Sequence, residues 1–180
     1  MKDKIQIDNL CFEPFLSEEQ IMKRTRLMGV DLSMRYEGKR PLVIGVLNGC
    51  FMFMSDLIKQ LDFDCDISFI KLASYSGTGQ GDLNELIGLN HDLEGRDVIV
   101  VEDIVDTGNS LRYTIDAIQR FKPNSIVACT LLLKPDAVLH DFEELTHVGF
   151  EIGNEFVIGY GMDYNGLFRN LKDVYRNVST

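Results

Sequence analysis

The sequence predicts an α/β fold in which a mostly parallel, twisted sheet is flanked by helices. Short apolar runs rich in β-branched residues alternate along the chain with segments of helical apolar spacing, which is the pattern of strand, helix and strand that builds parallel sheets. The apolar runs are continuous rather than alternating, so we expect strands buried on both faces. No internal repeat, low-complexity tract or linker interrupts the pattern, and we therefore expect one domain over residues 1–180.

The first half of the chain begins with a capping signal. Ser17 and Gln20 have the spacing of a capping box, and helical apolar spacing follows to near Gly38. The apolar run 42–47 predicts a buried strand, and helical spacing returns over 51–61.

The second half repeats this alternation. Strands are predicted over 67–73, 97–101 and 125–133, a helix over 111–121, and shorter strands near Val148 and over 156–159. The segment 74–82 is polar and rich in glycine, so we expect a long mobile loop of the kind that commonly closes over a site.

Composition excludes several classes of protein. The 180 residues include 18 Lys+Arg and 28 Asp+Glu, which gives a net charge of −10 and a sequence pI of about 4.7, and this charge disfavours a general nucleic-acid binder. The N-terminus lacks the apolar region of a secretory signal, and no window approaches the ~18 apolar residues of a membrane span. The four cysteines form no close pair, as in reduced proteins. We expect a cytoplasmic protein that engages neither membranes nor nucleic acids.

The segment after the predicted strand 97–101 carries the chemistry. Three carboxylates, Glu102, Asp103 and Asp106, fall within five residues, and no Lys or Arg lies between Asp97 and Leu111. Small residues follow at 107–110, where a helix start can hold phosphate. Ionised carboxylates accept hydrogen bonds from vicinal hydroxyls. One sugar phosphate could therefore bind both features, with its hydroxyls on the carboxylates and its phosphate at the helix start. The alternative is an acidic surface turn capped by Asp106.

The run from Val100 to Gly108 resembles the phosphoribosyl pyrophosphate loop of type I phosphoribosyltransferases, in the form of the hypoxanthine-guanine branch. Four further segments match that branch in order: 45–49, 74–75, 133–135, and 155–165 with Arg169. The resemblance covers about residues 16 to 171. It implies the type I phosphoribosyltransferase fold, with a core over about 38–150 and a small hood formed from about 1–16 and 151–180.

The resemblance also implies an activity. A member of this branch would transfer the 5-phosphoribosyl group from phosphoribosyl pyrophosphate to N9 of hypoxanthine or guanine, with Mg²⁺, and release IMP or GMP and pyrophosphate in purine salvage. It would form a homodimer or homotetramer. Three alternatives stay open: a xanthine-preferring enzyme, a regulator of this fold that binds RNA, and a scaffold that binds nucleotide without turnover.

The resemblance assigns roles around the acidic segment. Glu102 and Asp103 would hold the ribose hydroxyls, directly or through magnesium, and Asp106 would be the general base. The residues that would cradle the 5′-phosphate are Asp106, Thr107, Gly108, Asn109 and Ser110.

Further roles fall elsewhere in the chain. Lys134 would donate to the 6-oxo group of the purine, Asp163 would reach a metal, and Arg169 would contact pyrophosphate. The remaining implied substrate contacts are Phe156, which stacks on the base, Val157 and Met162 beside it, and Ser74 and Tyr75 in the closing loop. Without the resemblance, Lys134 and Arg169 read as surface residues and 156–158 as strand packing.

The chain departs from the family at two places. Leu47, Asn48 and Gly49 stand where relatives usually have Leu-Lys-Gly, so only a backbone role toward pyrophosphate survives, and the resemblance implies a cis peptide there. Asn109 and Ser110 stand where many relatives have Lys or Leu followed by Thr; the hydroxyl is kept, and we expect phosphate binding to persist. The three histidines, His91, His140 and His147, match no catalytic position.

Overall fold

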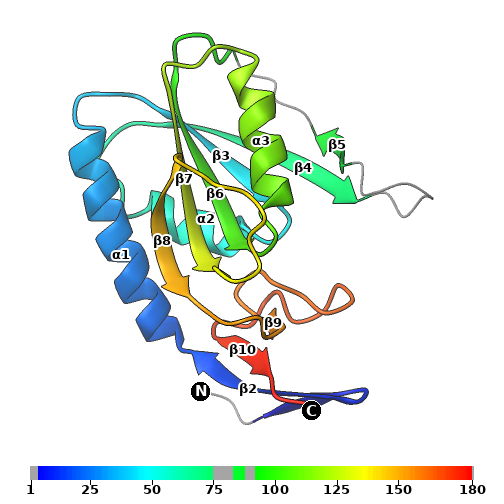
Figure 1. Ribbon diagram of the computed structural model, residues 1–180. Coiled ribbons are helices and arrows are strands. Elements are labelled where there is room, and N and C mark those ends of the chain that lie inside the picture. The colour runs from blue at the N-terminus through cyan, green and yellow to red at the C-terminus, as the bar shows by residue number, and fades with distance from the viewer. Residues whose placement is uncertain (1–3, 75–82, 88–91, 180) are drawn as a thin grey trace.

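A computed structural model describes residues 4–74, 83–87 and 92–179 and contains two sheets (Figure 1). The larger sheet has the order β5-β4-β3-β6-β7-β8. Its strands are β3 (Leu42–Leu47), β4 (Asp66–Ser74), β5 (Leu83–Ile87), β6 (Asp97–Val105), β7 (Ser125–Leu133) and β8 (Leu145–Glu151). The pairs β4–β3, β3–β6, β6–β7 and β7–β8 are parallel, and β5 is antiparallel to β4. The mostly parallel sheet expected from the sequence is confirmed.

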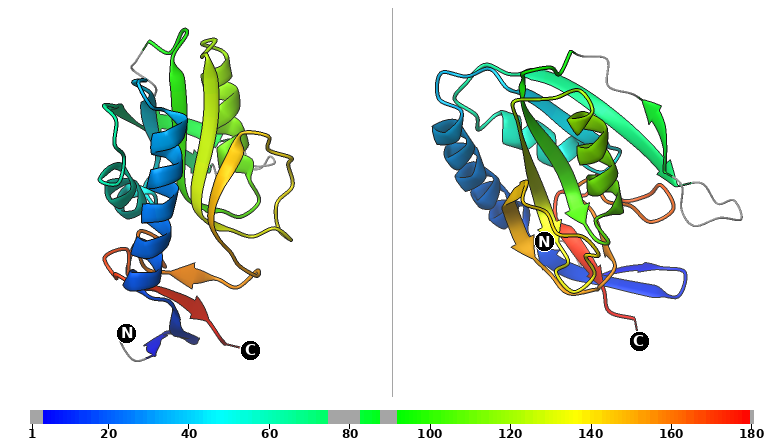
Figure 2. Two further views of the ribbon diagram at one scale, coloured as in Figure 1. Left: turned by 90° about the vertical axis from the view of Figure 1, so that its left-hand side faces the viewer. Right: turned by 45° about the horizontal axis from the view of Figure 1, so that its top comes forward.

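Helices cover both faces of this sheet (Figures 1 and 2). Helices α1 (Glu18–Arg35) and α2 (Phe51–Ile58) share one hydrophobic cluster with Ile99 of β6, whereas α3 (Asn109–Gln119) packs with Val98 and Val100 in a second cluster. Successive β6 residues therefore enter opposite cores, which explains the continuous apolar run in its sequence.

The smaller sheet joins the two ends of the chain. It has the order β1-β2-β10-β9, with antiparallel pairs, and its strands are β1 (Ile5–Ile7), β2 (Leu10–Leu16), β9 (Val157–Ile158) and β10 (Val174–Asn177). Phe12, Ile158 and Tyr175 form its own core. The arrows of β6, β7 and β8 in Figure 1 point toward this sheet, so the hood faces the carboxyl edge of the larger one. The small hood implied by the resemblance is confirmed.

The predicted start of the first helix is confirmed. The backbone N–H of Ser17 donates to Gln20 Oε1 (2.9 Å), and the Gln20 N–H donates back to Ser17 Oγ (3.3 Å), completing a capping box. The helix ends at Arg35, and the chain then turns through Gly38 at a φ of +69°. None of the helices in the described part of the chain has the length and apolar character needed to cross a membrane.

Several boundaries differ from those predicted. Strand β6 continues to Val105 rather than ending at residue 101, because its pairing with β7 runs on to Val105 opposite Leu133. Glu102 and Asp103 thus lie inside the strand rather than after it. Helix α3 starts at 109 instead of 111, and α2 ends at 58 instead of 61. Strands β1, β2, β5 and β10 were not predicted; they are short or contain polar residues, so they lack the continuous apolar signal of the central strands.

Candidate active site

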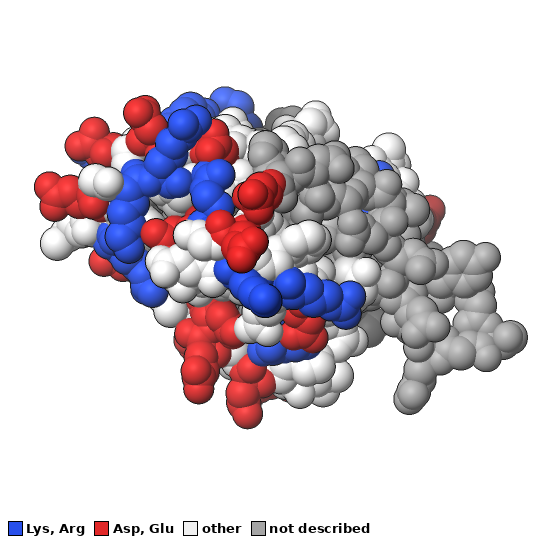
Figure 3. Space-filling model, turned by 90° about the horizontal axis from the view of Figure 1, so that it is seen from above, with Lys and Arg blue, Asp and Glu red and all other residues white. Residues whose placement is uncertain are grey.

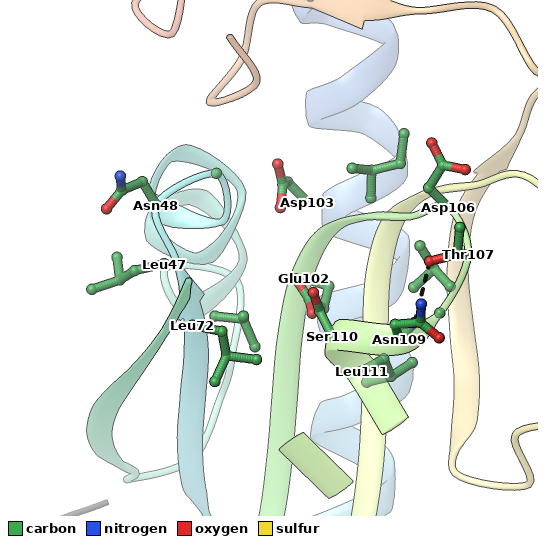
Figure 4. A pocket seen from close by; sticks show the side chains of 15 residues that line it. Leu47, Asn48, Leu72, Glu102, Asp103, Asp106, Thr107, Asn109, Ser110 and Leu111 are labelled. Carbon is green, nitrogen blue, oxygen red and sulfur yellow. Dashed lines mark hydrogen bonds between the residues drawn. The ribbon is translucent and has the colours of Figure 1, made fainter. Parts of the chain in front are cut away.

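Two cavities meet at the carboxyl edge of the larger sheet. The first, of about 290 Å³, is walled by the end of β3, by Glu102 and Asp103 of β6, and by residues 106–111 at the start of α3. Figure 4 shows Asp103 between Asn48 on one side and Asp106 on the other. The second, of about 180 Å³, is lined by Lys134 and by residues of the hood. Asp103, Ile104 and Asp106 line both cavities, so one ligand could occupy the two together.

The start of α3 forms the anion-binding end of the first cavity. Gly108 precedes the helix at a φ of +82°, and no side chain caps it. The N–H groups of a first helical turn lack partners within the helix and, with the helix dipole, favour an anion. Thr107, Asn109 and Ser110 line the cavity here, and Thr107 Oγ1 accepts from the Asn109 N–H at 3.4 Å. This end of the cavity suits a phosphate.

Two carboxyl groups line the cavity, Glu102 buried and Asp103 half-buried. Glu102 is 5% exposed, and burial together with the nearby Asp103 raises its pKa well above the ordinary range. Burial is also the largest cause that raises the pKa of Asp103 to about 6, against hydrogen bonds from backbone amides and the charge of Arg169, which lower it. The site therefore disfavours the charged form of both groups unless a cation joins them.

The three residues expected near metal do not form one group. Among the described residues, no three His, Cys, Asp or Glu side chains are placed to hold a metal ion together. Asp163 instead lies 2.5 Å from Arg169 and accepts from the Gly166 N–H at 2.7 Å. Glu102 and Asp103 still fit Mg²⁺, because this ion is usually held by one or two carboxylates and completes its octahedron with water and substrate oxygens.

Arg169 is tied to the hood. Its Nη1 donates to the Gly161 carbonyl at 2.6 Å, while Nη2 meets Asp163. Both Asp163 and Arg169 line the second cavity. Arg169 is therefore no detached surface residue, and its guanidinium lies at the edge of the site.

An ion pair joins the two cavities at their common wall. Lys134 Nζ donates to Asp106 Oδ2 at 2.6 Å; the lysine side chain is 7% exposed and the aspartate side chain 51%. This pair was not predicted from the sequence. A signal for it existed, because Val105 and Leu133 are register partners on neighbouring parallel strands and Asp106 and Lys134 are the next residues of each.

The second cavity has an apolar wall. Phe156 is 45% exposed, whereas Val157, Ile158 and Met162 are buried. The Phe156 ring lies edge-on to Tyr164, with centroids 6.1 Å apart, and tilted against Phe12 at 6.1 Å. The interpretation of 156–158 as ordinary strand packing thus applies to Val157 and Ile158, while Phe156 presents its ring to the cavity edge.

The turn after β3 packs against Asp103. The Leu47–Asn48 peptide is cis, as the resemblance implied. A Cβ at Gly49 would collide with the Asp103 carboxylate, and a Cβ at Gly161 would collide with the Gly49 carbonyl. The backbone role expected for Gly49 did not include this close contact, because no local sequence pattern predicts it.

The predicted closing loop and the three histidines remain to be placed. Ser74 ends β4, and Tyr75, most of the predicted closing loop and His91 lie outside the described residues. His147 is buried, with Nε2 3.0 Å from Asp31 Oδ2, and lines neither cavity. His140 contacts Asn109 at the phosphate end.

Comparison with known proteins agrees with the geometry. The family model described as "Phosphoribosyl transferase domain" matches residues 16–165. The hypoxanthine-guanine phosphoribosyltransferase of Streptococcus agalactiae is 41% identical over 167 residues, covering 92% of this chain and 92% of that protein. The bifunctional protein TilS/HprT of Listeria innocua is 42% identical over 158 residues, 87% of this chain; the match spans only 24% of that longer protein.

A solved structure shares the fold as well as the sequence. The hypoxanthine phosphoribosyltransferase of Staphylococcus aureus superposes with a TM-score of 0.86 at 38% identity, covering 91% of this chain and 90% of that one. Taken with the family match over residues 16–165, these findings show that the chain belongs to the phosphoribosyl transferase family, among its hypoxanthine-guanine members.

Proposed function

We propose that this protein transfers the 5-phosphoribosyl group of phosphoribosyl pyrophosphate to N9 of hypoxanthine or guanine, giving IMP or GMP and pyrophosphate, in purine salvage. The observation that carries the proposal is the pairing of Asp106 with Lys134 where the two cavities meet. A base in the second cavity and a sugar phosphate in the first would be joined at that point. The relatives named above support the same activity.

The first cavity would hold the phosphoribosyl group. The 5′-phosphate would accept hydrogen bonds from backbone and side-chain donors of Thr107, Gly108, Asn109 and Ser110, at the positive end of α3. Glu102 and Asp103 would accept from the ribose hydroxyls, directly or through Mg²⁺. Bound Mg²⁺ would offset the negative charge of the pyrophosphate group. The backbone of Leu47, Asn48 and Gly49, together with Arg169, would face pyrophosphate.

The second cavity would hold the base. Phe156 would stack on the purine, Val157 and Met162 would lie beside it, and the Lys134 ammonium would donate to the 6-oxo group. A 6-amino group carries hydrogens and offers no comparable acceptor, so this contact would select oxopurines over adenine. The same contact leaves the 2-position unconstrained, so a preference for xanthine is the alternative within this function.

The reaction exchanges one bond to C1 for another. The bond from C1 to pyrophosphate breaks with its electron pair leaving on pyrophosphate, and the N9 lone pair of the purine forms the new bond. The carboxylates near C1 stabilise the positive charge that develops on the sugar. Because the purine must also lose a ring proton, Asp106 accepts it as general base. When Lys134 turns to the 6-oxo group, the Asp106 carboxylate is released for that task.

The RNA-binding alternative finds little support in the charges. In the view from above in Figure 3, Asp and Glu side chains lie on both sides of the Lys and Arg side chains. Arg40 and Arg96 both pair with Asp66 at 2.7 Å, and Lys39 lies 3.5 Å from Asp97. Cations already paired with carboxylates attract a phosphate backbone weakly.

The protein is further proposed to act as one domain, in the cytoplasm, as a homodimer or homotetramer. Its four cysteines are all free thiols, which suits a reducing compartment. Leu27, Val30 and Met34 recur along one side of α1 and are 55%, 52% and 76% exposed, which suits association between copies. The core over about 38–150 would hold the phosphoribosyl group, and residues 151–180 would complete the base site.

The proposal is tested by offering each base separately with phosphoribosyl pyrophosphate and Mg²⁺. Nucleotide formed from hypoxanthine and guanine, with little from adenine, would support it. Product from xanthine alone would favour the xanthine-preferring enzyme. No product with any base, in protein shown to be folded, would overturn it and favour a binding or regulatory role; retention on RNA at two salt concentrations would then identify an RNA-binding protein.

A further inference from the structure

A histidine without a role in the proposed function is hydrogen-bonded to Asn109 at the phosphate end of the site. His140 Nε2 lies 2.7 Å from Asn109 Oδ1. An amide oxygen only accepts hydrogen bonds, so Nε2 carries the proton and donates. Asn109 is the first residue of α3 and lines the first cavity. This hydrogen bond therefore restricts rotation of the Asn109 carboxamide, which belongs to a residue that lines the cavity.

The segment around His140 packs on the outside of the phosphate loop. The Leu139 N–H donates to the Thr107 carbonyl at 3.0 Å. A Cβ at Gly108 would lie 2.8 Å from the Phe142 ring and 3.4 Å from the His140 ring, so both rings press against the loop where it enters the helix. The imidazole is thus held in contact with the loop as well as with Asn109.

Neighbouring groups hold the histidine ring in place. Its centroid is 5.9 Å from that of Phe142 in an edge-on arrangement. The Arg112 guanidinium lies 4.9 Å from the Phe142 centroid and donates to the Asp141 carbonyl at 3.0 Å. The His140 ring is therefore held by contacts with neighbouring side chains.

Because cations near the loop are already paired with carboxylates, a neutral amide donor would contribute to phosphate binding. Two cations that flank the loop are paired with carboxylates: Lys134 with Asp106, and Arg112 with Asp116 and Glu144 at 3.4 and 3.9 Å. A phosphate at this helix start would be met by backbone N–H groups, hydroxyls and the Asn109 amide. With Oδ1 bonded to His140, the two Nδ2 hydrogens of Asn109 are the donors left for a ligand.

We propose that His140 is a positioning residue for the 5′-phosphate: it orients the Asn109 carboxamide so that Nδ2 donates to the phosphate. This inference rests on the proposed function and names a residue pair at the position where many relatives have Lys or Leu. His140 does not touch the substrate; without it, the Asn109 side chain rotates and its donors lose their orientation.

The test uses pyrophosphorolysis of GMP by the full chain, with KM for GMP, KM for pyrophosphate and the Kd of GMP from calorimetry. His140→Ala is expected to raise KM and Kd for GMP about three- to ten-fold, the effect of one hydrogen bond between neutral groups, and to leave KM for pyrophosphate and kcat unchanged. His140→Gln, whose amide nitrogen can replace Nε2, should restore GMP binding. Leu139→Ala is the matched control, because this neighbouring side chain is 71% exposed.

A double variant separates positioning from a direct role. If His140 acts through Asn109, His140→Ala adds nothing once Asn109→Ala is present. Additive losses, unchanged GMP binding in His140→Ala, or equal losses for GMP and pyrophosphate would each overturn the inference while leaving the proposed function standing. If the unchanged chain neither binds GMP nor turns it over, the proposed function fails and the inference fails with it.

Discussion

The ammonium of Lys134 and the carboxylate of Asp106 are 2.6 Å apart, and they belong to residues that directly follow two neighbouring parallel strands. A buried ammonium needs a partner, since an unpaired charge in the interior is costly. Asp106 supplies that partner while no base is bound. A purine 6-oxo group would take over this role and release Asp106, so occupancy of the base site and availability of the general base are linked through one contact.

Replacing Asp106 by Asn is expected to lower kcat by about 10²-fold or more, because an amide cannot accept the ring proton and general bases typically contribute on that scale. GMP binding should persist, since the phosphate end of the site is intact. Rapid-mixing turnover and the Kd of GMP check both statements. Near-normal kcat would remove Asp106 from the role of base.

Replacing Lys134 by Ala is expected to lower the preference for guanine over adenine about ten- to a hundred-fold in the ratio of kcat/KM values, the usual size of a hydrogen bond to a charged group. The loss should fall on guanine. Lys172→Ala is the control, because that side chain is 72% exposed and pairs with Glu18. An unchanged ratio would show that Lys134 does not recognise the 6-position.

Adding one carbon at Gly49 is expected to displace the Asp103 side chain. In Gly49→Ala the new Cβ would meet the Asp103 carboxylate and push it from its place. A displacement of about 1 Å can cost on the order of 10²-fold in rate, so we expect kcat/KM to fall at least ten-fold. In the control Gly153→Ala, the new Cβ would meet only the end of the flexible Glu155 side chain. Equal activity of the two variants would contradict the close packing at Gly49.

The ionised form of Asp103 is expected to lower the stability of the folded protein at neutral and higher pH. Its pKa is raised by burial to about 6 from an ordinary value of 3.8, so the folded state binds its proton more tightly than the unfolded chain does. The associated stability is present below about pH 4 and is lost as the pH rises through 6.

An amide at this position carries no such penalty. Asp103→Asn, measured without Mg²⁺, should therefore raise Tm at pH 8 by several degrees, and the gain should shrink toward pH 4. Thermal unfolding at several pH values checks this, with exposed Asp116→Asn as the control. A gain independent of pH would show that desolvation of the Asp103 carboxylate is not its cause.

The sequence by itself determined the parallel core and the location of the chemistry. Continuous apolar strands, a capping box at Ser17 and the acidic run from Glu102 to Asp106 are local signals, because burial on both faces, helix starts and helix-start anion sites each depend on residues close together in the chain.

The tertiary structure decided which distant groups meet. The register of β6 and β7 brings Lys134 to Asp106, and close packing of backbone segments places Gly49 against Asp103. The return of the chain after β7 places His140 on Asn109. None of these contacts follows from local spacing, since each joins segments separated by at least 28 residues. They exist because strand pairing and core packing fix the segments in three dimensions, and the chemistry of the site depends on those contacts.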